Sequence, residues 1–317
     1  MVNEHSKSDK GVFDAVVSSN KQIGQIFYRL GLEFSGAGAA AFAKSEAGQF
    51  AELDLCGAAL PPAEAIPEEL VDAAQRMILL RRPFSFCDVS SHKEKTRVDI
   101  LYCVVGPASL RMTTLSTGDS VSVIGPLGSG FWVPEDKKTA LLVAGGMGAG
   151  PLLLLAKVLT ASWPKINVSA FAGAKTKEEL PFEKPLDEVS QQLGFSVAEF
   201  AEYGVTSMVA TDDGSAGYHG LVTDCLSEWL GEQNLAAKET IVYSCGPEEM
   251  LARVAEIAER KKFDCQVSME RRMACGIGLC QSCAVECRVA NSSETVYKLC
   301  CEDGPVFNSA EVVWSIR

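Results

Sequence analysis

The pattern of apolar and polar residues divides the chain into two long regions of different character. In residues 11–134, short apolar segments are separated by glycine, proline and polar residues; they include GVFDAVVSSN, QFAELDL, RMILLRRPFSF, RVDILYCVV and GDSVSVIGPLG. Short β-rich segments with frequent turn signals predict an antiparallel β-barrel or sandwich. The Pro- and Glu-rich stretch PPAEAIPEELVDAA predicts a loop with a short helix lying on that barrel.

From residue 135 onward, strands and helices are expected to alternate. The polar, proline-containing stretch VPEDKKTA (133–140) suits a domain junction. After it, TALLVAG, INVSAFAG, SMVATDDG and TIVYSCG have the character of strands, and PLLLLAKVL, LVTDCLSEWL and PEEMLARVAEIAERKK have that of helices. This alternation predicts a parallel, doubly wound sheet in a domain of residues 135–263. Residues 264–317 form a small cysteine-rich module, and residues 1–10 a polar tail.

Composition and charge exclude several broad classes of protein. The 317 residues are 47% hydrophobic and 22% charged, which is typical of a globular protein of two or three domains. There are 29 Lys and Arg against 41 Asp and Glu, and this acidic balance argues against nucleic-acid binding. The N-terminus lacks the apolar core of a signal peptide, and the apolar runs are too short and glycine-broken to span a membrane. We therefore expect a soluble, cytoplasmic protein.

The twelve cysteines predict metal ligands or redox thiols, because disulfides are rare in a reducing compartment. Seven of them lie at or after position 265, and Cys275, Cys280 and Cys283 have the spacing C-x4-C-x2-C. With a distant fourth cysteine this is the plant-type [2Fe–2S] spacing. Zinc is the main alternative, although structural zinc sites usually present two separate short pairs of ligands. Cys300 and Cys301 are adjacent, so their side chains should point in opposite directions and only one should be a ligand.

Two motifs lie at the carboxyl ends of strands expected in the α/β region, the edge at which open sheets bind ligands. The first, VAGGMGAGP, is a strand-to-helix loop whose glycines could admit a pyrophosphate: Gly145, Gly146 and Gly148. The second, YSCGPEEM, follows the last strand and contains Cys245, Gly246 and Pro247. Each motif taken alone is equally typical of an ordinary turn.

The segment AFAGAKTKEEL concerns the choice of nicotinamide. It places Lys175 and Lys177 after the second strand, where a conventional NAD dehydrogenase has an acidic residue. This argues for another mode of nicotinamide binding. A 2′-phosphate would favour such cations, but lysines in loops are usually solvated, so the choice between NADH and NADPH stays open.

The segment RRPFS is a candidate flavin motif in the barrel region. Arg82 could pair with a phosphate, Ser85 could hydrogen-bond a flavin edge, and Pro83 would stiffen the backbone between them. The order of parts is more specific than this motif: a barrel with R-P-x-S, then GPLG, a glycine loop, and CGP before a helix. Over residues 11–262 this order resembles the ferredoxin–NADP reductase superfamily. The resemblance implies that the barrel holds FAD and the α/β domain holds the nicotinamide dinucleotide.

The C-terminal sequence MACGIGLCQSCAVEC…YKLCCEDGPVF closely resembles the electron-transfer subunit of NAD-dependent dihydroorotate dehydrogenase. The resemblance extends over nearly the whole chain after residue 10, including TDDGSAGYHGLVTD and VSVIGPLGSGF. It implies that the cluster ligands are Cys275, Cys280, Cys283 and Cys301, with Cys300 as the alternative fourth ligand. It implies flavin contacts from Arg82, Pro83, Phe84, Ser85, Leu101, Tyr102, Cys103, Ala108 and Ser109. It also implies nicotinamide contacts from Gly145, Gly146, Gly148, Cys245, Gly246 and Pro247.

Some residues depart from the family pattern. The family commonly has Gly-Lys-Gly-Thr after its second flavin strand, whereas this chain has GPAS (Gly106–Ser109), which puts the contact of Ser109 with a phosphate in doubt. Cys87, Cys287 and Cys300 are additional cysteines to which the sequence assigns no role.

The resemblance implies a relay in which NADH passes a hydride to N5 of FAD and the flavin passes single electrons to the [2Fe–2S] cluster. Such chemistry belongs to the cofactors and needs no catalytic side chains. His5, His92 and His219 agree with this, because none lies in a catalytic pattern.

The family's partner is a separate FMN-containing catalytic subunit that interconverts dihydroorotate and orotate in pyrimidine biosynthesis, with NAD+ as acceptor and a heterotetramer expected. A second hypothesis keeps the cofactors but assigns the chain to a sulfide dehydrogenase, a bifurcating ferredoxin–NADP oxidoreductase or a soluble hydrogenase. A third is a non-catalytic, zinc-bearing interaction module that has lost flavin binding. The intact RPFS and CGP motifs argue against the third.

Overall fold

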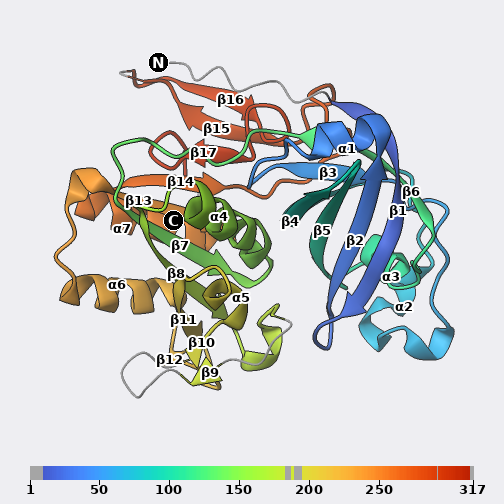
Figure 1. Cartoon of the computed structure of the whole chain (residues 1–317), viewed down its shortest axis with the longest axis horizontal. Coiled ribbons are helices and arrows are strands. Elements are labelled where there is room, and N and C mark those ends of the chain that lie inside the picture. Colours follow the sequence, from blue (N-terminus) through green and yellow to red (C-terminus); the bar gives the residue numbers. More distant parts are fainter. Residues whose placement is uncertain (1–9, 183–186, 189–194, 291, 315–317) are drawn as a thin grey trace.

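The computed structural model describes residues 10–182, 187–188, 195–290 and 292–314, so nearly all of the predicted polar tail 1–10 lies outside the described residues. The described residues form a barrel, a seven-stranded α/β sheet and two small two-stranded sheets (Figure 1). The barrel strands pair in the closed order β1-β2-β5-β4-β3-β6 and all pairs are antiparallel. Their bounds are β1 (Gly11–Gln22), β2 (Phe27–Ser35), β3 (Phe50–Leu53), β4 (Arg82–His92), β5 (Lys95–Cys103) and β6 (Ser120–Leu127).

The barrel is filled by aliphatic and aromatic side chains that point inward at alternate positions. Phe34 of β2 stacks on Phe42 of helix α1 (Gly36–Phe42), with ring centroids 3.9 Å apart, and both are buried. Phe86 of β4 meets Phe42 edge-on at 5.9 Å. Burial of each such aromatic ring contributes on the order of 2–3 kcal/mol, so this aromatic cluster fixes the barrel wall that carries the flavin motif.

The strand predicted at RMILLRRPFSF begins later than expected. Only Arg82 onward is in β4, and Met77 and Leu79 before it are 79% and 75% exposed. Strand β4 begins there because the strand beside it, β3, is short and its last paired residue is Leu53, which pairs with Arg82. Ahead of that point lies helix α2 (Val71–Ala74), inside the segment predicted to be a loop with a short helix.

The α/β region forms a seven-stranded sheet in the order β12-β11-β8-β7-β13-β14-β17. Every pair is parallel except β14 with β17. The bounds are β7 (Thr139–Gly145), β8 (Asn167–Ala174), β11 (Thr206–Thr211), β12 (Tyr218–His219), β13 (Thr240–Cys245), β14 (Asp264–Ser268) and β17 (Val306–Asn308). The main helices are α4 (Ala149–Ser162), α6 (Val222–Glu232) and α7 (Glu248–Lys261), with α5 (Ala198–Ala201) and the hairpin β9 (Asp187–Glu188) and β10 (Phe195–Ser196) beside them.

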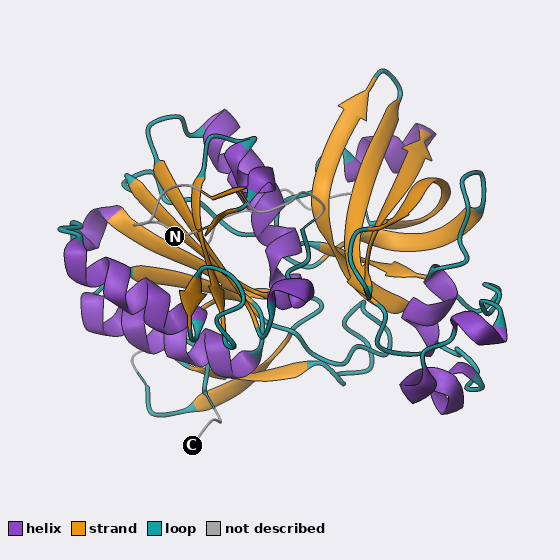
Figure 2. Ribbon diagram, turned by 90° about the horizontal axis from the view of Figure 1, so that it is seen from below, coloured by secondary structure: helices purple, strands orange, loops and turns teal. Residues whose placement is uncertain are grey.

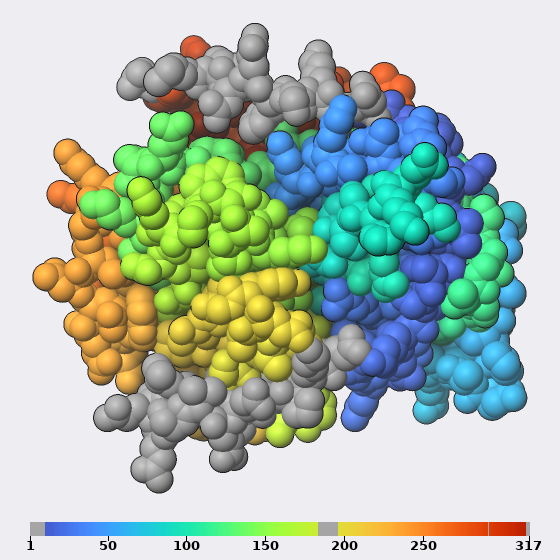
Figure 3. All heavy atoms as spheres, viewed as in Figure 1, coloured from blue at the N-terminus to red at the C-terminus, as the bar shows by residue number. Residues whose placement is uncertain are grey.

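Helices cover both faces of this sheet, and α4 lies between the sheet and the barrel (Figure 2). The central strands are almost wholly buried, which explains their continuous apolar sequences. Lys157 of α4 is bonded to the barrel, its Nζ lying 2.6 Å from Asp88 Oδ1 and 2.9 Å from the Val89 carbonyl oxygen. The two domains therefore pack directly against each other, as the space-filling view shows (Figure 3).

The C-terminal residues join both domains. Strands β14 and β17 extend the α/β sheet, and β15 (Ala284–Arg288) pairs with β16 (Thr295–Leu299) in a separate hairpin. The Ser129 amide, just after the barrel, donates to the Gly304 carbonyl at 2.6 Å. The range 264–317 predicted as a cluster module thus also contributes two strands to the neighbouring sheet, and its exact boundary stays a prediction.

Candidate redox site

A cleft of about 320 Å³ lies where the barrel, the α/β sheet and the C-terminal segment meet. Its lining combines three groups that are far apart in the sequence. The barrel contributes Phe50, Pro83, Phe84, Ser85, Leu101, Tyr102, Cys103 and Val105; the α/β domain contributes Met147, Gly150, Pro151, Cys245 and Ser268; and the C-terminal segment contributes Met269, Glu270, Arg271, Met273 and Pro305. One space therefore joins the predicted flavin, nicotinamide and cluster regions.

The barrel wall of the cleft presents aromatic and apolar surface. Tyr102 is buried, and its ring stacks on that of Tyr28 with the ring centroids 5.3 Å apart. Its hydroxyl group donates a hydrogen bond to Asn20 Oδ1 at 3.1 Å. Burial raises the pKa of the Tyr102 phenol, so it keeps its proton. Phe84 meets the Tyr102 ring edge-on at 6.5 Å. These rings give the wall a fixed, flat apolar surface against which a planar ring system could pack.

The glycine loop and the CGP motif, about a hundred residues apart in the sequence, touch each other in the structure. Loop residues 146–148 form a 3₁₀ turn that leads into α4, and a methyl group on Gly148 would collide with the carbonyl of Cys245. A methyl group on Gly145 would lie 2.8 Å from Pro247 Cδ. Gly146, with φ +50°, faces open space instead. Small residues thus let the two motifs pack while leaving backbone accessible at the start of α4.

Cys245 occupies the end of β13 with its side chain buried in the cleft wall. Desolvation raises the pKa of its thiol to about 12. A thiol with such a pKa stays protonated at neutral pH and is a poor nucleophile. The structure therefore gives Cys245 the role of a small wall residue rather than that of a reactive thiol.

The residues that connect β14 to the cysteine loop also line the cleft, and the sequence alone did not single them out. Arg271 makes a bidentate ion pair with Glu248, at 2.9 and 3.2 Å, which ties this connection to the start of α7. Glu270 and Met273 lie beside it. The topology could have indicated these residues as cleft-lining. Strand β14 ends at the ligand-binding edge of the sheet, and the chain must then cross the cleft to reach Cys275.

The cysteine loop brings its cysteine residues into contact with one another. The Cys280 amide donates to Cys275 Sγ at 3.4 Å, and Cys283 Sγ lies 3.3 Å from Cys301 Sγ. Gly276 and Gly278 have φ of +66° and +86°, and the Gly278 amide donates to Cys301 Sγ at 3.2 Å. Among the described residues no three Cys, His, Asp or Glu side chains converge as ligands of a single metal ion.

The adjacent cysteines point to different sides. Cys301 Sγ faces Cys283, whereas Cys300 Sγ donates to the Met269 carbonyl oxygen at 3.3 Å, on the side of the α/β sheet.

The exposed Cys280 thiol has a lowered pKa of about 6, mainly because of hydrogen bonds with Ser282 and, to a smaller extent, with Cys275. The thiolate is the form that binds metal, so this local geometry favours ligation.

Two predicted flavin residues, Ser109 and Arg82, make hydrogen bonds within the chain, and a third, Ala108, is buried. The Ser109 hydroxyl accepts from the amides of Val105 and Gly106 at 3.0 and 3.1 Å, at the start of helix α3 (Pro107–Met112), and both Ser109 and Ala108 are buried. The Arg82 guanidinium donates to the carbonyl groups of Leu80 and Arg81 at 2.8 and 3.0 Å. The cofactor contacts assigned to these three residues stay predictions.

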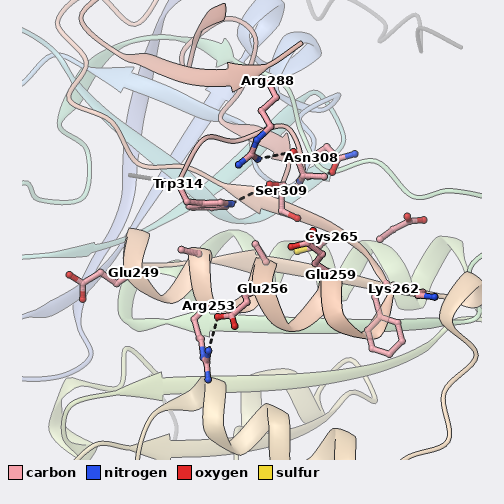
Figure 4. Close-up of a pocket in the computed structure, with 15 residues that line it drawn as sticks. Glu249, Arg253, Glu256, Glu259, Lys262, Cys265, Arg288, Asn308, Ser309 and Trp314 are labelled. Carbon is pink, nitrogen blue, oxygen red and sulfur yellow. Dashed lines mark hydrogen bonds and ion pairs between the residues drawn. The ribbon is translucent and has the colours of Figure 1, made fainter. Parts of the chain in front are cut away.

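A larger groove of about 1010 Å³ lies elsewhere, between α7, β14, β17 and the segment around Trp314 (Figure 4). Charged and polar side chains make up most of its wall, with Arg253 paired to Glu256 at 2.6 Å and Arg288 bonded to the Ala310 and Val312 carbonyl groups. It contains none of the predicted site residues. The smaller cleft is therefore the candidate site, because it unites the motifs.

Relatives with assigned names decide the family. A protein of Caldanaerobacter subterraneus subsp. tengcongensis, named dihydroorotate dehydrogenase B (NAD(+)), electron transfer subunit, is 34% identical over 300 residues, which are 95% of this chain and 98% of that one. The chain belongs to this family. A member from Listeria monocytogenes serovar 1/2a is 36% identical, covering 81% of this chain and 89% of that one. A member from Geobacillus kaustophilus is 39% identical, covering 76% and 83%.

Two family models match within the chain. Residues 270–313 match the iron–sulfur cluster binding domain of dihydroorotate dehydrogenase B, and residues 142–256 match the oxidoreductase NAD-binding domain. The protein is thus an oxidoreductase subunit for electron transfer, as the sequence predicted. None of the helices in the described part of the chain combines the length and apolar character needed to cross a membrane.

Solved structures confirm the fold. The NADH-dependent reduced ferredoxin–NADP oxidoreductase, studied for flavin-based electron bifurcation, superposes with a TM-score of 0.70 at 25% identity, covering 95% of this chain and 90% of that one. Phthalate dioxygenase reductase superposes with a TM-score of 0.55 at 18% identity, covering 92% and 78%. The predicted combination of barrel, parallel-sheet domain and C-terminal module in a ferredoxin reductase-like fold is confirmed.

Proposed function

We propose that this chain carries electrons between a nicotinamide dinucleotide, FAD and a [2Fe–2S] cluster, and that it serves an FMN-containing subunit that oxidises dihydroorotate in pyrimidine biosynthesis, with NAD+ as the acceptor. The observation that carries the proposal is the single cleft in which the barrel motif, Cys245 and the segment leading to the cysteines share one space. A relay requires this closeness, because hydride and electron transfer act only over short distances. Family membership supplies the substrate class.

The proposed cluster ligands are Cys275, Cys280, Cys283 and Cys301. Each iron of a [2Fe–2S] cluster takes two thiolates. The contact of Cys283 Sγ with Cys301 Sγ suits one such pair, and the bond from the Cys280 amide to Cys275 Sγ brings the other two residues together. The amide of Gly278, directed at Cys301 Sγ, would hydrogen-bond a ligand sulfur. Such amides stabilise the negative charge that a cluster bears.

The proposed flavin contacts are the cleft-lining residues of β4 and β5, together with Arg82. The Tyr102 and Phe84 rings provide apolar surface, and the Ser85 side chain, partly buried in the wall, offers a hydrogen bond. When bound, FAD would supply the conversion between the single electrons that the cluster carries and the hydride that NAD+ accepts. The chain's own residues would position the ring and exclude water from it.

The proposed nicotinamide contacts are the glycine loop and CGP. The start of α4 presents unpaired backbone amides and the positive end of the helix dipole, which suit a pyrophosphate. The open space at Gly146 allows such an approach, and the buried Cys245 shapes the wall beyond it without reacting. We propose NADH rather than NADPH, on the family's name.

The proposed assembly is a heterotetramer with the FMN-containing subunit in the cytoplasm. The exposed side chains of Ile277 and Leu279, 44% and 78% accessible, place apolar surface beside the cysteines where a partner could pack. All twelve cysteines are free, which supports a reducing compartment.

Co-expression with an FMN-containing, dihydroorotate-oxidising subunit tests the proposal. We expect the two chains to co-purify as a heterotetramer that reduces NAD+ when dihydroorotate is added, whereas the catalytic subunit alone does not reduce NAD+. NADPH formation coupled to ferredoxin, with no response to dihydroorotate, would instead identify a bifurcating oxidoreductase, like the solved structure that superposes with a TM-score of 0.70.

A further inference from the structure

Glu52 is a buried carboxyl group in the barrel wall with no apparent structural role. It lies in β3, is 0% exposed, and neither of its carboxylate oxygens has a hydrogen-bond partner among the described residues. Buried carboxylates are normally paired, because an unpaired one costs several kcal/mol of desolvation. A position that keeps such a group is therefore a candidate for function.

Glu52 lies between the flavin motif and the cysteine loop. Its backbone pairs with Pro83 of β4 on one side and Ile124 of β6 on the other. Its side chain touches Gly276, because a methyl group there would lie 2.6 Å from Glu52 Cγ and 2.8 Å from Cδ. Gly276 follows Cys275 directly, so the carboxyl group is packed under the first turn of the loop.

The charges around Glu52 come from both sides. Burial is the main reason why the pKa of its carboxyl group is raised to about 7. The positive charges of Arg82 and Arg81 lower this pKa, and the negative charge of a Cys280 thiolate raises it further. Two guanidinium groups of the barrel thus favour the ionised form, and the cysteine loop opposes it. The carboxyl group therefore interacts electrostatically with the flavin motif and the cysteine loop at once.

We propose that Glu52 tunes the iron–sulfur cluster: packed against Gly276, its carboxyl group, in the ionised form, places a negative charge beneath the Cys275–Cys280 turn and lowers the cluster's reduction potential. This inference rests on the proposed function, since it requires the cluster to be present. A buried charge acts strongly in this way because little water screens it. Lowering the potential favours transfer of electrons from the cluster onward to the flavin and NAD+.

The test is a spectroelectrochemical titration of the cluster in wild-type protein and in Glu52→Gln, at about pH 9, above the carboxyl pKa of about 7. We expect the variant's cluster to be reduced more easily, with about a tenfold higher ratio of reduced to oxidised cluster at the same applied potential, which is 59 mV for one electron. Glu52→Met, also neutral and of similar size, should shift the potential in the same direction.

The matched control is Glu33→Gln, which removes the same charge from β2, where Glu33 is partly exposed and pairs with Lys95 at 2.6 Å. The control should leave the potential unchanged. Equal potentials in wild type and both neutral Glu52 variants would overturn the proposal, and so would an equal shift in Glu33→Gln. A wild-type chain without any cluster signal would instead refute the proposed function itself.

Discussion

Replacing Cys301 with serine is expected to abolish the [2Fe–2S] cluster, whereas the same change at Cys300 is expected to leave the cluster in place. Cys301 Sγ lies 3.3 Å from Cys283 Sγ and accepts the Gly278 amide, so it completes the second pair of thiols. Without it one iron lacks a thiolate, and a two-iron cluster with three ligands does not persist. Iron should fall from about two per chain to near zero.

Cys300→Ser is the matched control because it changes the neighbouring residue in the same way. Cys300 Sγ donates to the Met269 carbonyl oxygen, and a serine hydroxyl can make the same bond, so the cost in stability should be about 1 kcal/mol or less. Iron content and the visible spectrum of the purified variants provide the measurement. A cluster retained in Cys301→Ser and lost in Cys300→Ser would reverse the ligand assignment.

Gly148→Ala is expected to reduce the rate of flavin reduction by NADH about 10- to 100-fold while leaving both redox cofactors bound. Gly148 has φ −59°, so alanine is allowed there on backbone grounds. The obstacle is steric: the new methyl group would strike the Cys245 carbonyl and lie 2.8 Å from the Gly246 amide nitrogen. Such overpacking costs about 1–3 kcal/mol and would displace the glycine loop from CGP.

The barrel and the cysteine loop do not depend on this contact, so the flavin and iron content of Gly148→Ala should stay at wild-type levels and dithionite should still reduce both. Gly231→Ala is the control, because Gly231 lies in α6 with open space around its Cα. Stopped-flow reduction by NADH distinguishes the two variants. A wild-type rate in Gly148→Ala would show that the packing of the glycine loop on CGP does not matter for nicotinamide binding.

Strands β7, β8, β11 and β13 of the α/β sheet could be predicted from the sequence to within about three residues, whereas β12, β14 and β17 were not predicted. TALLVAG corresponds to β7 (Thr139–Gly145), since a strand buried on both faces has a continuous apolar sequence. Strand β2 (Phe27–Ser35) was not predicted, although its buried Leu30, Leu32 and Phe34 alternate regularly with more polar positions. In the structure Arg29 pairs with Asp99 on β5 at 2.9 Å, a cross-strand partner that the sequence cannot reveal.

In the site, likewise, the local motifs could be predicted from the sequence, whereas the contacts between distant segments could not. The motifs themselves could be found from spacing, but their meeting in one cleft depends on the packing of α4 against the barrel. The sequence left Cys300 and Cys301 as alternatives, because the directions of their side chains depend on the turn that follows β16. Glu52 had no sequence signal, since a single acidic residue in a strand is ordinary, and only its burial against Gly276 distinguishes it.

The measurement that tests the central claim most directly is an anaerobic visible spectrum of the purified chain before and after stoichiometric NADH. We predict a flavin band with a broad iron–sulfur shoulder, both of which bleach when NADH is added. A colourless, zinc-containing protein would contradict the account, and so would a coloured protein whose flavin bleaches while the iron–sulfur absorbance stays unchanged.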